Sequence, residues 1–510
     1  MPASHPVSRS RLVGWIGWAG LEAAGRLALL TAGAAELSRL LIPREFGVTA
    51  LALTFASFAA VCVGVPFEEA LARRRSLRKL HLEAALGASH ATALAVLAIS
   101  FPLGWALARL HGEPELASML PIATTTVVFT GHAAILTALA RRLRRFNEIA
   151  IASLAGHALG APASIAIALA GGGGWALIVQ RLLIVAVGAM VLQWRLGFAI
   201  RPRWSLTPLR EFGGFARVAF LDRLADNLNY LVFNNFVAAL FGATVLGYVN
   251  MAMRLIEPIR GAIDATAHNL AFSYFASAAS DRARLGAMAA RAVALVAPLV
   301  APVFLGMAAV APTLLPLVAG PGWDGAIGIA TCLAMGAALA GPPRMILTAL
   351  SAAGRPEFGL ASTVAGFLAS LVALAATAAL GPIGVGLARI AGDVTRAAAA
   401  LGLSSRAMDW TRRRRWAALA PAWLLSGAMA LAVAAAGAWA PLGVGWARLA
   451  ALVALGVVVY LSLLATFARA ALLRLLAASA LDRLGSSAAS CRSPRSQAED
   501  AAARALAAAP

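Results

Sequence analysis

Residues 288–311 read MAARAVALVAPLVAPVFLGMAAVA and carry one charged side chain, Arg291. A helix needs about 20 mostly apolar residues to cross the roughly 30 Å hydrocarbon core of a bilayer, and this run is long enough. It does not alternate apolar with polar residues, as a strand of a membrane barrel does. The run therefore predicts a transmembrane helix.

The composition indicates that most of the chain lies in a membrane. Of its 510 residues, 61% are hydrophobic and 13% charged, and the mean hydropathy is +0.81, whereas a soluble chain carries roughly 25% charged residues. Further apolar runs predict an all-α integral membrane protein with about fourteen transmembrane helices. They lie near residues 12–38, 46–67, 84–108, 118–140, 148–170, 174–195, 213–241, 244–271, 288–311, 325–350, 358–380, 383–404, 416–438 and 443–468.

Basic residues gather in alternate loops, which predicts the orientation because cytoplasmic loops are enriched in lysine and arginine. Both termini then lie in the cytoplasm. The net charge of +21 indicates topology and contacts with anionic membrane lipids rather than nucleic-acid binding. The basic loops contain Arg73, Arg74, Arg75, Arg78, Lys79, Arg141, Arg142, Arg144, Arg145, Arg195, Arg201, Arg203, Arg210, Arg282, Arg284, Arg355, Arg406 and Arg412 to Arg415.

The sequence contains no motif of an enzyme. No nucleophile elbow, phosphate loop or paired-histidine motif occurs, and the three cysteines have no metal-ligand spacing. We therefore expect no catalytic residues, no metal and no cofactor.

Three short motifs recur in the same order in the two halves of the chain. LLIPREFG at 40–47 matches LFGATVLG at 240–247, and GGGGWAL at 171–177 matches GPIGVGL at 381–387. ARRLRRFNE resembles SAAGRPEF in the loops after the fourth and tenth predicted helices. An even number of spans separates the repeats, so they predict two six-helix lobes related by a pseudo-two-fold along the membrane normal.

These repeats divide the chain into predicted parts. The expected division is an N-terminal lobe over 1–200, a C-terminal lobe over 201–405, two further helices over 406–470 and a disordered cytoplasmic tail over 485–510.

Charged and polar residues also lie inside predicted helices, where an isolated charge costs about 2.5–3.5 kcal/mol. They recur at helical spacing in four helices and predict a shared polar cavity. The alternative is local neutralisation within each helix, by the pairs Glu22–Arg26, Arg254–Glu257 and Arg389–Asp393. The four groups are Glu22, Arg26 and Glu36; Asp222, Asp226 and Asn229; Asn250, Arg254, Glu257, Gly261, Asp264 and His268; and Arg389, Asp393 and Arg396.

The run LSRLLIPREFGVTALAL at 37–53 resembles Wzx-type oligosaccharide flippases, which are polysaccharide transporters of the multidrug/oligosaccharidyl-lipid/polysaccharide superfamily. The likeness continues through 209–255, LLPLVAGPGWDGA at 314–326 and GPIGVGLARI at 381–390. It covers roughly residues 15–470.

The resemblance implies a flippase in a bacterial inner membrane. It would move a polyprenyl-diphosphate-linked oligosaccharide from the cytoplasmic to the periplasmic leaflet by alternating access, for exopolysaccharide, O-antigen or capsule. Its expected partners include a polysaccharide polymerase and glycosyltransferases of the same pathway. The cavity candidates for substrate are Arg26, Arg254, Arg389, Glu22, Asn250 and Glu257, and the candidates for ion coupling are Asp222, Asp226 and Asp264. Asn234 stands where many relatives have an aspartate. If that aspartate binds a coupling cation in the relatives, Asp226 or Asp222 must do so here, or coupling differs.

Other functions remain open at this point. A cation-coupled multidrug antiporter of the same superfamily would favour acidic cavity residues over arginines. A lipid II flippase would differ only in the sugar. A non-transporting scaffold of a polysaccharide assembly complex would tolerate neutral cavity residues.

The predicted orientation can be tested by cysteine labelling in intact cells, in a background without the native cysteines. Cysteines at Glu113 and Trp323 are expected near the outer face, and cysteines at Arg74 and Arg413 near the inner face. An impermeant maleimide should leave positions 74 and 413 unlabelled. Strong labelling of either would contradict the orientation.

Overall fold

The computed structural model describes residues 9–73, 78–197, 201–203, 216–278, 280–408, 410–439 and 445–468. This part is helical and contains no strand, and the predicted tail over 485–510 lies outside it. The elements are α1 (Arg9–Leu40), α2 (Pro43–Arg73), α3 (Lys79–His111), α4 (Leu116–Arg142), α5 (Phe146–Leu169), α6 (Trp175–Leu196), α8 (Ala216–Ala276), α9 (Arg282–Ala319), α10 (Asp324–Ala340), α11 (Arg344–Ala352), α12 (Glu357–Ala376), η1 (Ala378–Leu380), α13 (Pro382–Ala407), α14 (Arg412–Trp439), α15 (Gly445–Leu463) and η2 (Leu464–Ala468).

The helices confirm the predicted membrane class. Ten helices in the described residues are long and apolar enough to cross a bilayer, and the pair α10 and α11, bent by 44°, makes an eleventh. One of the ten, over 223–264, belongs to α8, which Gly242 divides into two arms. With these arms counted separately, and with the more polar α1 and α13, the predicted fourteen segments are present.

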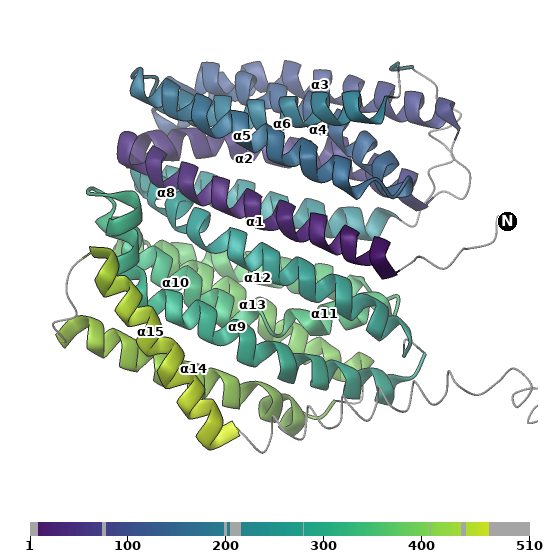
Figure 1. The fold of residues 1–510 in the computed structure, drawn as a ribbon. Coiled ribbons are helices and arrows are strands. Elements are labelled where there is room, and N and C mark those ends of the chain that lie inside the picture. Colours follow the sequence, from purple (N-terminus) through teal and green to yellow (C-terminus); the bar gives the residue numbers. More distant parts are fainter. Residues whose placement is uncertain are drawn as a thin grey trace, which may run out of the picture.

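The helices form two lobes and a C-terminal pair (Figure 1). Helices α1 to α6 pack on one another and make the purple and blue lobe, and α8 to α13 make the teal and green lobe. Helices α14 and α15, in yellow-green, pack against α9 at the far side of the second lobe. The lobes meet mainly where α1, α2 and α3 contact α8 and α9.

One end of the bundle carries the turns between α1 and α2, between α3 and α4, and between the two arms of α8. We call it the outer end, after the predicted orientation. At this end Gly242 has φ 83° and ψ 170°, a conformation that a glycine adopts without steric cost. The chain reverses there, and the second arm of α8 begins beside the start of α2.

Two glycines bring α2 and this second arm into direct backbone contact. A Cβ placed on Gly47 would lie 1.7 Å from the carbonyl oxygen of Ala243, and one on Gly247 would lie 1.8 Å from that of Pro43. The contacts are reciprocal, and all four residues belong to the repeated motifs at 40–47 and 240–247. The two repeats therefore pack on each other and form the joint between the lobes.

Further contacts close the outer end around this joint. The indole nitrogen of Trp323 donates a hydrogen bond of 2.8 Å to the carbonyl oxygen of Ser38, and the Phe46 ring meets the Trp323 ring edge-to-face at 5.0 Å. Arg39 donates a hydrogen bond of 2.8 Å to the carbonyl oxygen of Leu317. These contacts join α1 and α2 to α9 and α10, and Trp323 is only 1% exposed.

Because the joint leaves no room for a side chain, we expect a single methyl group on Gly47 to destabilise the protein strongly. Gly47→Ala should lower the free energy of unfolding by about 1–3 kcal/mol or more, because the backbone of α8 cannot yield as a side chain can. The measurement is the unfolding midpoint of the purified protein. The control is Gly427→Ala in α14, where a Cβ has no neighbour within 4 Å and alanine favours the helix. Equal midpoints for the two variants would contradict the tight crossing.

Candidate functional site

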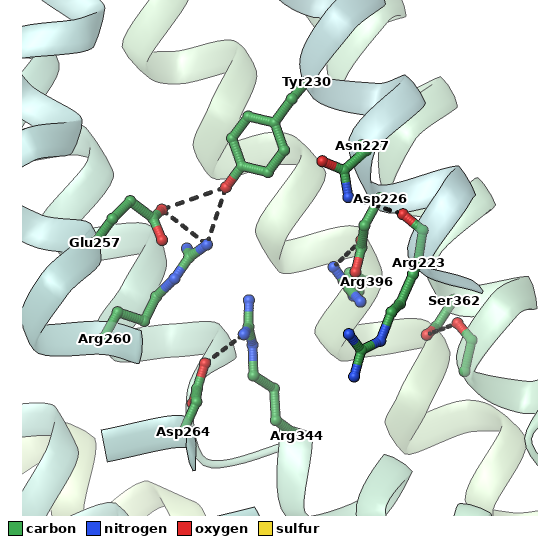
Figure 2. Close-up of polar contacts among 11 residues, drawn as sticks. Arg223, Asp226, Asn227, Tyr230, Glu257, Arg260, Asp264, Arg344, Ser362 and Arg396 are labelled. Atoms are coloured by element: carbon green, nitrogen blue, oxygen red, sulfur yellow. Dashed lines mark hydrogen bonds and ion pairs between the residues drawn. The ribbon is translucent and has the colours of Figure 1, made fainter. Parts of the chain in front are cut away.

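A polar cavity of about 110 Å³ lies inside the second lobe, between α8, α11, α12 and α13. Its lining is unusual for the interior of a membrane protein, because four arginines and two aspartates contribute to it. Figure 2 shows side chains from both arms of α8 and from α11 and α13 pointing into one common space. The lining residues are Asp226, Asn229, Tyr230, Arg260, Arg344, Thr363, Gly366, Ser370, Arg389, Gly392, Asp393 and Arg396.

The fold brings these side chains together by three local features. The reversal at Gly242 places the two arms of α8 side by side. The break between α10 and α11 puts Arg344 at the start of a new helix. Small residues let α12 approach α13, since a Cβ on Gly392 would lie 2.8 Å from the Cβ of Ser370 and 2.9 Å from the carbonyl oxygen of Gly366.

Two ion pairs cross between helices. Arg396 of α13 lies 3.0 Å from Asp226 of α8, and Arg344 of α11 lies 2.5 Å from Asp264 of α8. These side chains are 22–38% exposed, which indicates contact with a wet space rather than full burial. Both pairs tie the arms of α8 to the rest of the lobe.

A third pair forms along the second arm of α8. Arg260 lies 2.8 Å from Glu257, three residues earlier. The Tyr230 hydroxyl, on the first arm, accepts a hydrogen bond of 3.3 Å from Arg260 and donates one of 3.4 Å to Glu257 (Figure 2). The three polar groups therefore satisfy one another.

The remaining lining arginine, Arg389, has a different environment. Its side chain packs against the rings of Tyr230 and Phe233, with centroids 5.2 and 5.0 Å from the guanidinium carbon. Arg389 is 8% exposed, and its Nε has no hydrogen-bond acceptor. Within the described part of the chain no ion pair joins it to a carboxylate.

The alternative of local neutralisation fails for all three helical pairs. Within the described residues no ion pair links Glu22 to Arg26, Arg254 to Glu257, or Arg389 to Asp393. Glu257 instead pairs with Arg260. Arg254 and Arg389 instead stack on aromatic rings of other helical segments, which tertiary packing brings against them.

The predicted site residues divide into two groups. Asp226 and Arg389 line the cavity, and Glu257 and Asp264 adjoin it through their ion pairs. The others do not line it: Glu22 and Arg26 lie on α1, while Asn250 and Arg254 lie nearer the outer end of the second arm of α8. The side chains of Asp222 and His268 are outside the described structure.

Arg254 and Asn234 both lie at the contact between the lobes. The guanidinium of Arg254 is 5.1 Å from the Phe46 ring of α2, and the side chain is half-buried. Asn234 is buried and donates a hydrogen bond of 2.9 Å to the Thr54 hydroxyl of α2. The amide at position 234 thus bridges the lobes. By contrast, the Asn250 side chain donates back to the carbonyl oxygen of Leu246 in its own helix.

The sequence alone did not identify Arg260 and Tyr230 as site residues. Arg260 lies one position away from the polar stripe that contains Gly261, and Tyr230 comes from the other arm of α8. One signal was available, because Arg260 follows Glu257 at the i+3 spacing that favours an ion pair. The contribution of Tyr230 required knowledge of how the arms pack.

Arginine guanidinium groups bind anions, so the polar interior of this protein is suited to anionic ligands. Three of the acidic side chains at the cavity, Asp226, Asp264 and Glu257, are each paired with an arginine, while Asp393 forms no ion pair among the described residues.

Comparison with known sequences identifies the family. The profile of a family described as "Polysaccharide biosynthesis protein" matches residues 37–328, which is more than half of the chain. The chain is 24% identical over 343 residues to the "Succinoglycan biosynthesis transport protein ExoT" of Rhizobium meliloti (strain 1021), covering 67% of this chain and 69% of that protein.

Solved structures share the fold. The "Lipid II flippase MurJ, inward closed conformation" superposes with a TM-score of 0.69 at 13% identity, over 90% of this chain and all of that chain. A "multidrug resistance MATE family transporter of the MOP superfamily", in an inward-facing conformation, gives a TM-score of 0.56 at 16% identity, over 75% of this chain and 97% of that chain. At these identities the likeness concerns the fold.

The ion pair between Arg344 and Asp264 predicts a characteristic pattern of stability. Arg344→Met should lower the free energy of unfolding by about 1–3 kcal/mol, because it leaves a carboxylate without its partner inside the membrane. The double variant Arg344→Met/Asp264→Leu should recover part of this loss. A suitable control is Lys79→Met, because Lys79 pairs with Glu83 at 3.7 Å while 69% exposed and should change stability by less than about 1 kcal/mol. Strictly additive losses in the double variant would show that the pair contributes nothing.

Proposed function

Because the chain belongs to the polysaccharide biosynthesis protein family and is a membrane transporter of the MOP superfamily, we propose that it flips a lipid-linked oligosaccharide. The substrate is a polyprenyl-diphosphate-linked oligosaccharide, moved from the cytoplasmic to the periplasmic leaflet of a bacterial inner membrane. The product feeds the synthesis of an exopolysaccharide, O-antigen or capsule, where a polymerase and glycosyltransferases act. The similarity to a succinoglycan biosynthesis transport protein supports this substrate class.

The observation that carries the proposal is that Arg254 forms no ion pair with a carboxylate among the described residues. Arg254 lies inside the membrane at the contact between the lobes. Its expected partner, Glu257, is occupied by Arg260. A fixed positive charge at this depth costs about 2.5–3.5 kcal/mol. The cost is offset if a substrate diphosphate binds there, since a guanidinium matches phosphate oxygens in charge and geometry.

Arg26 gives the first lobe a comparable charge. It lies on α1, is exposed, and has no ion pair to Glu22 within the described helices. Arg26 belongs to the first lobe and Arg254 to the second, and we infer that the two arginines hold an anion between the lobes from both sides. Such a position lets the lobes exchange access while the substrate stays bound.

The closed outer end supports entry from the cytoplasmic side. The hydrogen bonds of Trp323, Arg39 and Thr54 join the lobes in the outer half of the bundle; the one at Thr54 is about 11 residues, or roughly 16 Å, from the start of α2. The joint at Gly47 and Gly247 lies there too. We infer that the lobes separate at the inner end first, with both termini in the cytoplasm.

The membrane potential favours this direction. With a negative cytoplasm, moving one negative charge outward gains about 2.3 kcal/mol per 100 mV, so a diphosphate with two charges gains about 4.6 kcal/mol. A coupling cation is then needed mainly to reset the empty carrier. Of the candidates for ion coupling, Asp226 and Asp264 already hold arginines, so a cation there would have to displace a guanidinium.

Substitutions of Arg254 test the proposal. Arg254→Ala should abolish export of the polysaccharide, and Arg254→Lys should keep part of it, because the charge remains while the two-pronged donor is lost. Arg254→Ala/Glu257→Ala should stay inactive, since Glu257 is paired with Arg260. Export is measured in cells that lack the chromosomal gene, with each variant present at normal membrane abundance.

The matched control is Arg109→Ala. Arg109 also stacks on an aromatic ring, Trp105, at 3.7 Å, but lies near the outer end of α3 and should retain full export. An active Arg254→Ala/Glu257→Ala double variant would remove Arg254 from the substrate site. Export of cationic dyes without any effect on polysaccharide would favour the multidrug antiporter instead.

A further inference from the structure

The second lobe contains a buried positive charge that the proposed transport does not use. Arg389 of α13 is more than nine-tenths buried and lines the cavity. Its Nε lacks an acceptor, and its contacts with the Tyr230 and Phe233 rings offset part of the cost of burial. A buried guanidinium without a counter-charge or a full set of acceptors is strongly unfavourable. Among the described residues, no ion pair gives Arg389 an anionic partner.

The neighbouring carboxylates do not supply it. Glu257, Asp264 and Asp226 are engaged by Arg260, Arg344 and Arg396 respectively. That leaves one further carboxylate of the lining, Asp393.

Asp393 also lines the cavity, but one of its oxygens lies against a neighbouring helix. A Cβ placed on Gly336 of α10 would lie 2.7 Å from its Oδ2, so this carboxylate lies against α10. Arg389 instead stacks on two rings of α8. The two side chains diverge although they are four residues apart on one helix, and no ion pair joins them in the described structure.

The space in front of Arg389 suits a small ligand. The cavity of about 110 Å³ has room for several waters, or for one small anion with water, because a single water needs only about 10–15 Å³ of such volume. The Asn229 Oδ1 also lacks a donor, and a water between it and an anion would satisfy both.

We propose that this cavity binds one small inorganic anion, chloride, through the guanidinium of Arg389. The anion neutralises Arg389 and lets α13 pack against α8 without an unpaired charge. Binding requires no substrate and no transport, so the inference stands or falls independently of the proposed function. The arginines at positions 260, 344 and 396 are each paired with a carboxylate, which leaves Arg389 as the lining arginine that forms no ion pair among the described residues.

The test is anion-dependent stability of the purified full-length protein. Chloride is titrated against gluconate at constant ionic strength, once with sodium and once with choline as the cation, while thermal unfolding is followed by tryptophan fluorescence. The unfolding midpoint should rise by several degrees and saturate with chloride, equally with either cation. Arg389→Gln should weaken the apparent chloride affinity at least tenfold, and Arg389→Lys should weaken it less.

The matched control is Arg109→Gln, a ring-stacked arginine outside the cavity, which should keep the wild-type chloride response. An unchanged response in Arg389→Gln would overturn the proposal. So would a response that follows sodium rather than chloride, because it would assign the site to the carboxylates of Asp226 or Asp393. If Arg389→Gln does not fold, a bromide soak of wild-type crystals decides the question: an anomalous peak in the cavity supports the site, and its absence overturns it.

Discussion

The close crossing of α2 with the second arm of α8 is the contact on which the arrangement of the lobes depends. Gly47 and Gly247 each lie against a backbone carbonyl of the other helix, so the two lobes share a joint with no side chain between them. The joint lies at the outer end, beside the Trp323 and Phe46 rings. A joint at one end lets small rotations of the lobes become larger separations at the other end, in line with the proposed entry of substrate from the inner end.

Arginines are paired differently inside the second lobe and at the contact between the lobes. Within the lobe, arginines on α8, α11 and α13 pair with Glu257, Asp264 and Asp226. These pairs cross-link the helices, and breaking one would leave a charge inside the membrane. The lobe is therefore suited to move as one body. Between the lobes, Arg254 rests on the Phe46 ring without an ion pair among the described residues, so its charge remains available to a ligand.

This division bears on the proposed transport of an anionic cargo. Three acidic groups of the second lobe, Glu257, Asp264 and Asp226, are paired with arginines, and the amide of Asn234 bridges to Thr54. The positive charge that a cation would bring to the second lobe is already built into the chain. Transport driven mainly by the membrane potential acting on the cargo is consistent with that arrangement.

The sequence by itself determined the membrane class, the fourteen apolar segments, the two-lobed repeat and the presence of charges inside the helices, because hydrophobic length and helical periodicity are local properties. It also identified Arg389, Asp226 and Arg254 as intramembrane charges. The tertiary structure decided their partners. The i+3 and i+4 spacing suggested Arg254–Glu257 and Arg389–Asp393, yet Glu257 meets Arg260 and Arg389 meets two rings of α8. Ion pairs depend on the distance between side chains in space, and for helices far apart in the sequence only packing sets that distance.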